Sequence, residues 1–166
     1  MSKSIYIYGA SGHGLVVADI ARACGYDDII FVDDGENKYP SFDDIKRTSG
    51  IPIAFGVGSN AIRAKLFEKV LTSGFEIVSL VHPTAIISPS VTIGKGTVVM
   101  PNVVVNVKAV IGDGVILNTS CVVEHECIIE NFVHISPKVA LAGDVKVGRF
   151  THIGIGSNVI QGIIIG

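Results

Sequence analysis

The chain has 166 residues, of which 48% are hydrophobic and 17% charged, with a formal net charge of −2. This composition indicates a folded protein with a buried core and excludes a disordered chain. There is no basic surplus for nucleic acid, and no apolar run approaches the roughly 18 residues of a membrane span. Three cysteines without disulfide spacing and the absence of a signal peptide favour a cytoplasmic location.

The two halves of the chain differ in composition. Nine of the eleven aromatic residues lie before residue 81, and most of the charged side chains also lie there. The part that follows is rich in Val, Ile and Leu and poor in charge. We therefore predict two domains, residues 1–80 and residues 81–166, joined without a flexible linker.

The first half alternates predicted strands with predicted helices, which favours a small α/β domain with a short, Rossmann-like parallel sheet. Strands are expected at 5–8, 29–32, 51–55 and 75–81, and helices at 15–24 and 61–73. The expected apolar face of the first helix consists of Leu15, Val16, Ile20 and Ala21.

Two glycine turns each follow a strand and precede a helix. The first has glycines at 9, 12 and 14, and the second has glycines at 56 and 58. Free backbone N–H groups and the helix dipole favour a phosphate there, although a purely structural turn explains the glycines equally well. The spacing differs from that of dinucleotide-binding folds and leaves room for a mononucleotide. Asp33 and Asp34 follow the second strand, where such folds place an acid for the nucleoside.

The second half has a sixfold sequence period. Every sixth position from 81 to 165 is Val, Ile or Leu. This repeat predicts short parallel strands in triangular coils of three hexads, with the aliphatic residue and the small residue four positions later facing inward. We expect the glycines that directly follow the aliphatic residue to supply positive φ angles at the turns. An ordinary β-sandwich is the alternative, but it would not keep register over fifteen repeats. The glycines concerned are Gly94, Gly112, Gly148, Gly154 and Gly166.

Candidate chemistry lies in Glu124-His125-Glu126, a titratable cluster in a half with few charges. An acid beside a histidine suits a general base, although an exposed turn would show the same residues. Gly143 follows one full coil later and should stack on His125. His134 lies half a coil from His125 and therefore on another face, and His152 should stack on His134.

Together these motifs resemble one family. Tyr-Gly-Ala-Ser-Gly-His-Gly at 8–14, the Asp pair, 55–60 with Arg63, His82-Pro83, Asn118 and the cluster at 124–126 are similar to the sugar acetyltransferases related to sialic acid O-acetyltransferase. Bacterial UDP-4-amino-sugar N-acetyltransferases are the most similar in pattern. The resemblance implies a left-handed parallel β-helix, a homotrimer, acetyl-CoA as co-substrate, a UDP-sugar amine as acceptor and no metal. General rules of chain handedness would favour the right hand.

The resemblance also implies site residues. His125 is the implied general base, and Glu126 orients it. The residues implied for acetyl-CoA are Asn118, His134, Gly143 and Ile155. Those implied for the nucleotide sugar are Gly9, Ser11, Gly12, His13, Asp33, Asp34, Gly56 and Gly58.

Two departures from the family pattern stand out. Ser59 occupies a position where Asn is usual. The chain also ends at Gly166, partway into a hexad, whereas the family continues with coils and a tail that hold pantetheine and adenine. We therefore expect a β-helix truncated at its C-terminal end, which leaves the affinity for CoA open.

The expected reaction is direct transfer, with the backbone N–H of Gly143 stabilising the oxyanion. Cys121 and Cys127 occupy inward positions of the repeat and are interpreted as core residues. Three alternatives stay open: O-acetylation of a sialic acid, a zinc carbonic anhydrase using histidines 125, 134 and 152, and a trimeric nucleotide-sugar-binding module without turnover.

Overall fold

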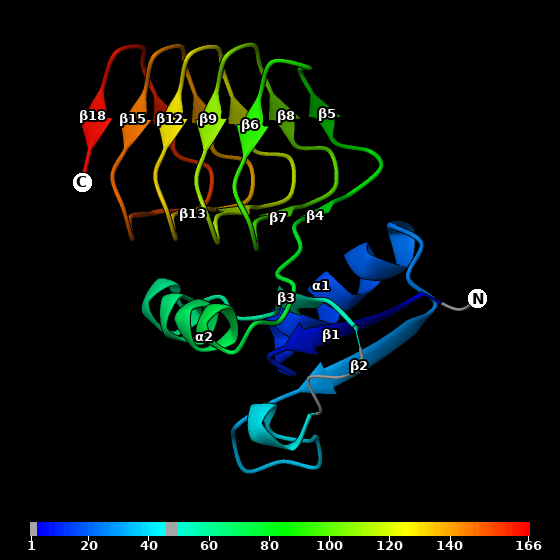
Figure 1. Cartoon of the computed structure of the whole chain (residues 1–166). Helices are drawn as coiled ribbons and strands as arrows, with labels where there is room; N and C mark the ends of the chain where they lie inside the picture. Colours follow the sequence, from blue (N-terminus) through cyan, green and yellow to red (C-terminus); the bar gives the residue numbers. More distant parts are fainter. Residues whose placement is uncertain (1–2, 46–49) are drawn as a thin grey trace.

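The computed structural model describes residues 3–45 and 50–166 and shows a small α/β domain beneath a triangular solenoid (Figure 1). The α/β domain consists of β1 (Ser4–Tyr8), α1 (Gly12–Ala23), β2 (Asp28–Val32), the 3-10 helix η1 (Phe42–Asp44), β3 (Ile53–Phe55) and α2 (Asn60–Thr72). Its strands pair in parallel in the order β2-β1-β3.

The solenoid consists of two-residue strands in three parallel sheets. The first sheet contains β4 (Leu80–Val81), β7 (Val98–Val99), β10 (Ile116–Leu117), β13 (His134–Ile135) and β16 (His152–Ile153). The second contains β5 (Ile86–Ile87), β8 (Val104–Val105), β11 (Val122–Val123), β14 (Ala140–Leu141) and β17 (Asn158–Val159). The third contains β6 (Thr92–Ile93), β9 (Val110–Ile111), β12 (Ile128–Ile129), β15 (Lys146–Val147) and β18 (Ile164–Ile165).

Each strand pairs with the strand three hexads away along the chain, as the sixfold period predicts. Leu117 of β10 pairs with Val99 one coil before it and with Ile135 one coil after it. These side chains are fully buried, as are Cys121 and Cys127. The apolar period therefore fills the interior of a left-handed β-helix, in agreement with the predicted fold class.

Four details differ from the sequence predictions. First, α1 begins at Gly12, not at residue 15, because only Gly9 to Ser11 form the turn. Second, Leu15 and Val16 are exposed, because the helix face toward the sheet takes positions three and four apart. The buried residues of α1 are Gly14, Val17, Ala18, Ile20 and Ala21.

Third, residues 75–81 do not form one strand. Ile77 makes a single bridge to Ile53, and the next strand, Leu80–Val81, already pairs with Val98–Val99 in the solenoid. The chain therefore changes sheet between Ile77 and Leu80, because the edge of the small sheet stands against the first coil.

Fourth, the positive φ angles do not fall on the glycines that directly follow the aliphatic positions, apart from Gly166. They occur two positions further on, where most residues are not glycine. The non-glycine residues are Asn102, Lys108, Ser120, Glu126, Phe132, Lys138, Asp144 and Phe150. Gly94 and Gly112 are needed for space instead, since a Cβ on Gly94 would lie 2.5 Å from the carbonyl carbon of Gly112.

The first solenoid sheet faces the α/β domain (Figure 1). Cys24 at the end of α1 donates from Sγ to the carbonyl of Val81 over 3.2 Å. Phe67 of α2 packs edge-on against Phe132, with ring centroids 5.4 Å apart. One apolar cluster joins α1 and the inner residues of the coils. The two domains are therefore packed together, which places the glycine turns against the coils.

Candidate active site

The two glycine turns pack directly against each other. A Cβ on Gly14 would lie 2.0 Å from the carbonyl oxygen of Gly9, and a Cβ on Gly56 would lie 2.7 Å from the Cα of Gly14. Gly9 also has a φ of +113°, a conformation that favours glycine. At these three positions glycine is required by the packing of the protein itself.

Gly12 and Gly58 have a different environment. A Cβ at either position would meet no atom within 4 Å. Ser11 makes no side-chain cap to α1, and neither α1 nor α2 has an acidic residue in its first turn. Within the described residues, the N–H groups of Gly58 and Ser59 donate no hydrogen bond. The space and the free donors beside these two helix starts suit an anion such as a phosphate.

Asp33 supports the first glycine turn. Its Oδ2 accepts a hydrogen bond from the N–H of Ala10 over 2.8 Å, and its Oδ1 accepts from the N–H of Gly35 and from the side chain of Asn37. The carboxylate therefore fixes the turn to the end of β2.

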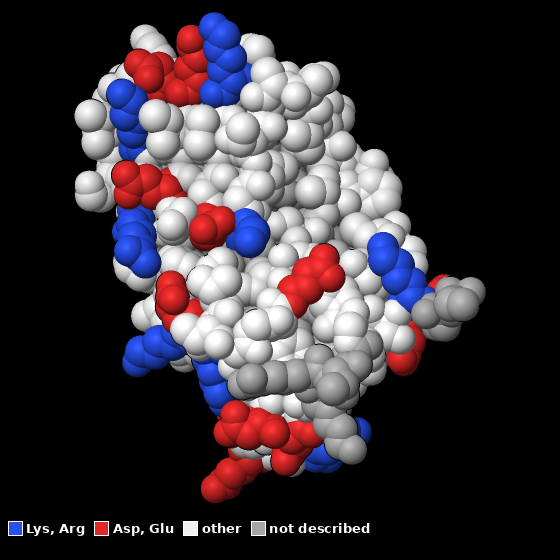
Figure 2. Space-filling model, in the orientation of Figure 1, with Lys and Arg blue, Asp and Glu red and all other residues white. Residues whose placement is uncertain are grey.

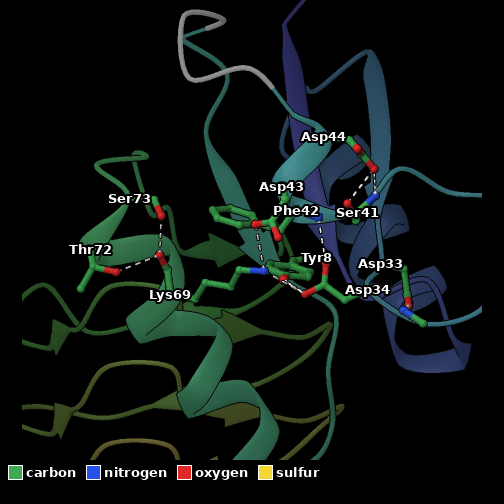
Figure 3. Close-up of polar contacts among 11 residues, drawn as sticks. Tyr8, Asp33, Asp34, Ser41, Phe42, Asp43, Asp44, Lys69, Thr72 and Ser73 are labelled. Atoms are coloured by element: carbon green, nitrogen blue, oxygen red, sulfur yellow. Dashed lines mark hydrogen bonds and ion pairs between the residues drawn. The ribbon is translucent and has the colours of Figure 1, made fainter.

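Asp34 is engaged within the protein (Figure 3). It accepts from the Tyr8 hydroxyl, from the N–H of Phe42 and from Nζ of Lys69. Burial alone would raise the pKa of Asp34, but these donors outweigh it and hold the pKa below its usual value. Lys69 also pairs with Asp43 of η1. Asp34 thus fastens the segment after β2 to β1 and α2.

Three histidines follow one another where the first glycine turn faces the first solenoid sheet, with His134 next to both His13 and His152. His134 stacks on His152, as the spacing predicts, with ring centroids 4.5 Å apart. His13 lies 6.4 Å from His134 between ring centroids. His134 Nε2 lies 3.0 Å from the amide nitrogen of Asn118, and His152 Nε2 lies 2.8 Å from the hydroxyl of Ser136.

Two of these rings, those of His13 and His134, are held neutral. Burial, with smaller contributions from His152, Arg63 and His13, lowers the pKa of His134 from 6.5 to about 4. Burial and Arg63 lower the pKa of His13 to about 4, and its Nε2 has no partner in the described structure. At neutral pH these rings can orient a neighbour by hydrogen bonding but do not carry a charge.

His125 lies at a different corner, between β11 of the second sheet and β12 of the third. The side chain is half exposed, and its Nδ1 lies 3.2 Å from Oε2 of Glu126. Glu124 is turned to another partner, because its Oε2 accepts from the side chain of Asn106 one coil earlier. Of the two acids beside His125, Glu126 is therefore the one that contacts the imidazole.

Gly143 lies against His125 one coil later, as its place in the repeat predicts. A Cβ on Gly143 would lie 2.4 Å from Cε1 of His125. The N–H of Gly143 donates no hydrogen bond within the described residues, whereas the next N–H, that of Asp144, donates to the carbonyl of His125 over 2.9 Å. The glycine makes room for the imidazole and leaves one donor beside it.

Within one chain, the predicted site residues form two groups. Asn118 and His134 lie with His13 beside the first sheet, and Ile155 is an exposed residue of the turn after β16. His125 stands at the corner between the other two sheets. The sequence reasoning did not assign a role to Arg63, which is 1% exposed and contacts both domains. A signal was present, because Arg63 precedes the buried residues Phe67 and Val70 of α2 at helical spacing, where an apolar side chain is expected.

The remaining candidates concern cysteines, metals and membranes. Burial raises the pKa of Cys121 to about 12, which opposes thiolate formation and a nucleophilic role. Among residues 3–45 and 50–166, no three His, Cys, Asp or Glu side chains come together as a metal site would need. In the same part of the chain, no helix has the length and apolarity required to cross a membrane.

Comparison with known proteins shows which family shares this sequence and fold. Residues 4–70 match the family described as the PglD N-terminal domain. Over 113 residues, or 59% of the chain, the sequence is 35% identical to UDP-N-acetylbacillosamine N-acetyltransferase of Bacillus subtilis (strain 168). That match spans about half (51%) of the length of the curated relative.

Two solved structures cover almost the whole chain. The acetyltransferase domain of PglB from Neisseria gonorrhoeae FA1090 is 35% identical, with a TM-score of 0.86, over 99% of this chain and 92% of that one. PerB from Caulobacter crescentus, solved in complex with CoA and GDP-perosamine, is 37% identical, with a TM-score of 0.93, over 98% and 83%. The matched domain, the shared solenoid and these identities show that the chain belongs to the hexapeptide-repeat sugar N-acetyltransferases.

Proposed function

We propose that this protein transfers the acetyl group of acetyl-CoA to the amine of a nucleotide-linked 4-amino-4,6-dideoxy sugar in bacterial glycan biosynthesis. The observation that carries this proposal is the His125 corner, where an imidazole with a carboxylate partner lies over a glycine with a free N–H. The relatives support it, since one is named for UDP-N-acetylbacillosamine and PerB was solved with CoA and GDP-perosamine.

The nucleotide sugar binds at the two glycine turns. Its phosphates lie beside Gly12, His13 and Gly58, where the helix starts offer free donors and no side chain blocks the approach. Ser11 adds a hydroxyl that caps nothing else. Asp33 acts by shaping this turn, and Asp34 by holding the segment beside the nucleoside, since its oxygens already accept hydrogen bonds.

The reaction is a direct transfer. His125 removes a proton from the amine as its nitrogen attacks the thioester carbonyl, and Glu126 holds the imidazole in orientation. The N–H of Gly143 donates to the oxyanion of the tetrahedral intermediate. The C–S bond then breaks, and the leaving sulfur of CoA takes the proton from His125.

A homotrimer completes the site. His125 and the group of Asn118 and His134 lie on different sides of one solenoid, so a neighbouring copy brings the corner of one chain to the face of another. Most of the solenoid surface in Figure 2 carries no acidic or basic side chain. Val110 and Ile128, on the outer side of the third sheet, are 45% and 39% exposed, as expected for a face that packs on a copy of itself. Acetyl-CoA lies at this junction, near Ile155 of one copy.

The reaction takes place in the cytoplasm. The three cysteines of the chain are unpaired, which suits a reducing compartment, and acetyl-CoA is the co-substrate. No metal takes part in the proposed chemistry.

The experiment is an acetylation assay with the purified chain, acetyl-CoA and a UDP-4-amino-4,6-dideoxy sugar, followed by release of free thiol. Parallel reactions replace the acceptor with the corresponding GDP sugar, with sialic acid, or with no acceptor. Thiol release that depends on an amino sugar supports the proposal. Release with sialic acid alone would identify an O-acetyltransferase, and binding of the nucleotide sugar without any release would identify a binding module. Metal analysis of the same sample excludes or reveals zinc.

A further inference from the structure

Arg63 is a buried cation at the junction of the two domains. From α2, its Nη1 donates to the carbonyls of Val57 and Gly58 in the second glycine turn, each over 3.0 Å. Its Nε donates to the carbonyl of Gly114 over 2.6 Å. Its Nη2 donates to the carbonyl of Phe132 over 3.2 Å. One guanidinium thus ties the turn to two successive coils.

The partners of Arg63 are unusual for a buried charge. All of its acceptors in the described structure are carbonyl or amide oxygens, namely Val57 O, Gly58 O, Asn60 Oδ1, Gly114 O, Phe132 O and Val133 O. No carboxylate accepts from it in the described part of the chain, so its charge is solvated by dipoles and is not cancelled by an ion pair. An apolar side chain in its place would leave these carbonyls without their donor, so the guanidinium holds the turn and the coils in a fixed relation.

The contacts also fix the direction of two peptide groups. A trans peptide points its N–H opposite to its carbonyl. The carbonyls of Val57 and Gly58 point at Arg63, so the N–H groups of Gly58 and Ser59 point away from it. These are the N–H groups that donate no hydrogen bond in the described structure. The arginine therefore aims the free donors of the turn outward.

We propose that Arg63 is a positioning residue that sets the second glycine turn on the solenoid and aims its free N–H donors at the sugar nucleotide. This role rests on the proposed acetyl transfer. The residue touches neither substrate and acts through the turn and through the coil carbonyls at 114 and 132. A lysine cannot replace it, because one ammonium cannot span acceptors on the turn and on two coils.

The test compares Arg63→Gln, Arg63→Lys and the matched control Arg22→Gln. Arg22 lies on the exposed side of α1, paired with Asp19. Steady-state kinetics are measured at a temperature where each variant is folded by circular dichroism. We expect both Arg63 variants to lose about 10- to 100-fold in kcat/KM for the nucleotide sugar, since a displacement of about 1 Å can cost 10²-fold. The KM for acetyl-CoA should change less than twofold, and Arg22→Gln should match the wild type. Folded Arg63 variants that unfold at lower temperature but keep wild-type kinetics would show a structural role only.

A second measurement does not depend on the reaction. Burial is the main cause of the low pKa values of His13 and His134, and the charge of Arg63 lowers both further. His152 and His13 are the other titratable groups that act on His134. NMR titration of the imidazoles should therefore show higher pKa values for His13 and His134 in Arg63→Gln than in Arg22→Gln. Unchanged values would contradict the inferred geometry even if the wild-type protein proves to have another activity. An inactive wild-type protein with the expected titration shifts would instead refute the proposed function and leave the placement of Arg63 standing.

Discussion

The corner that carries His125 and the face that carries His134 place the same side chain in two environments. His125 is half exposed, contacts one carboxylate and lies over a glycine. His134 is packed between another imidazole, an amide and the α/β domain. Burial lowers the pKa of His134 to about 4, so this ring stays neutral at physiological pH and poorly suits a proton acceptor. The comparison supports the proposed roles, with proton transfer at the His125 corner and orientation of a ligand at the His134 face.

Removal of His125 should have the largest effect. We expect His125→Ala to lower kcat by about 10²- to 10⁴-fold, the usual range for loss of a general base. The KM for the nucleotide sugar should barely change, because the proposed binding site for that substrate is at the glycine turns. His82→Ala is the control, since His82 contacts Thr84 in the first coil. If steady-state kinetics show that His125→Ala keeps its kcat and His134→Ala loses it, the base assignment is wrong and the two histidines have the opposite roles.

Gly143, which lies against the imidazole of His125, gives the second test. Gly143→Ala places a Cβ where Cε1 of His125 lies 2.4 Å away, so the imidazole must move. We expect kcat to fall by about 10²-fold, as for other misplacements of about 1 Å. Gly154→Ala is the matched control, because its Cβ would meet only the Ser157 hydroxyl at 3.9 Å. Equal kcat values in the two variants would show that Gly143 has no role in the active site.

The carboxylate partner of His125 should matter less. Glu126→Gln keeps the shape of the side chain at a position with a φ of +61° but removes the charge. An exposed ion pair contributes up to about 1 kcal/mol, so we expect kcat to fall about fivefold. Glu68→Gln, on the exposed side of α2, controls for the loss of one charge. A loss as large as that of His125→Ala would mean that Glu126 itself takes part in proton transfer.

Because His134 is held neutral in the folded protein, the protein should lose stability in acid. The folded protein holds the pKa of His134 near 4, below the value of 6.5 for the free side chain. Between these two pH values the unfolded chain binds a proton that the folded chain does not, so the free energy of unfolding decreases as pH falls from 6.5 to 4.

In His134→Asn, the number of protons taken up on unfolding in this window should fall by up to about one. Urea midpoints measured from pH 7 to pH 4 give this slope, with His82→Asn as the control. An unchanged slope would show that His134 is not held neutral in the folded protein. His134→Ala should also raise the KM for acetyl-CoA.

The sequence by itself determined the solenoid and the local part of the site. The sixfold period fixes which residues stack one coil apart, because three hexads complete one coil. The pairs of His125 with Gly143 and of His134 with His152 could therefore be read from spacing alone. Cys121 in the core follows from the same rule.

Only the tertiary structure showed which residues of the α/β domain contact the solenoid. The contacts of His13 with His134, and of Arg63 with Gly114 and Phe132, connect α/β elements to coils far away along the chain. No spacing rule covers such pairs, because the α/β domain does not share the period of the solenoid. Inside the α/β domain too, no repeat relates distant residues, and the sequence did not show that Asp34 is held by Tyr8, or which side of α1 is buried. These choices follow from packing within the α/β domain and against the solenoid, since the packing fixes which side chains lose contact with water.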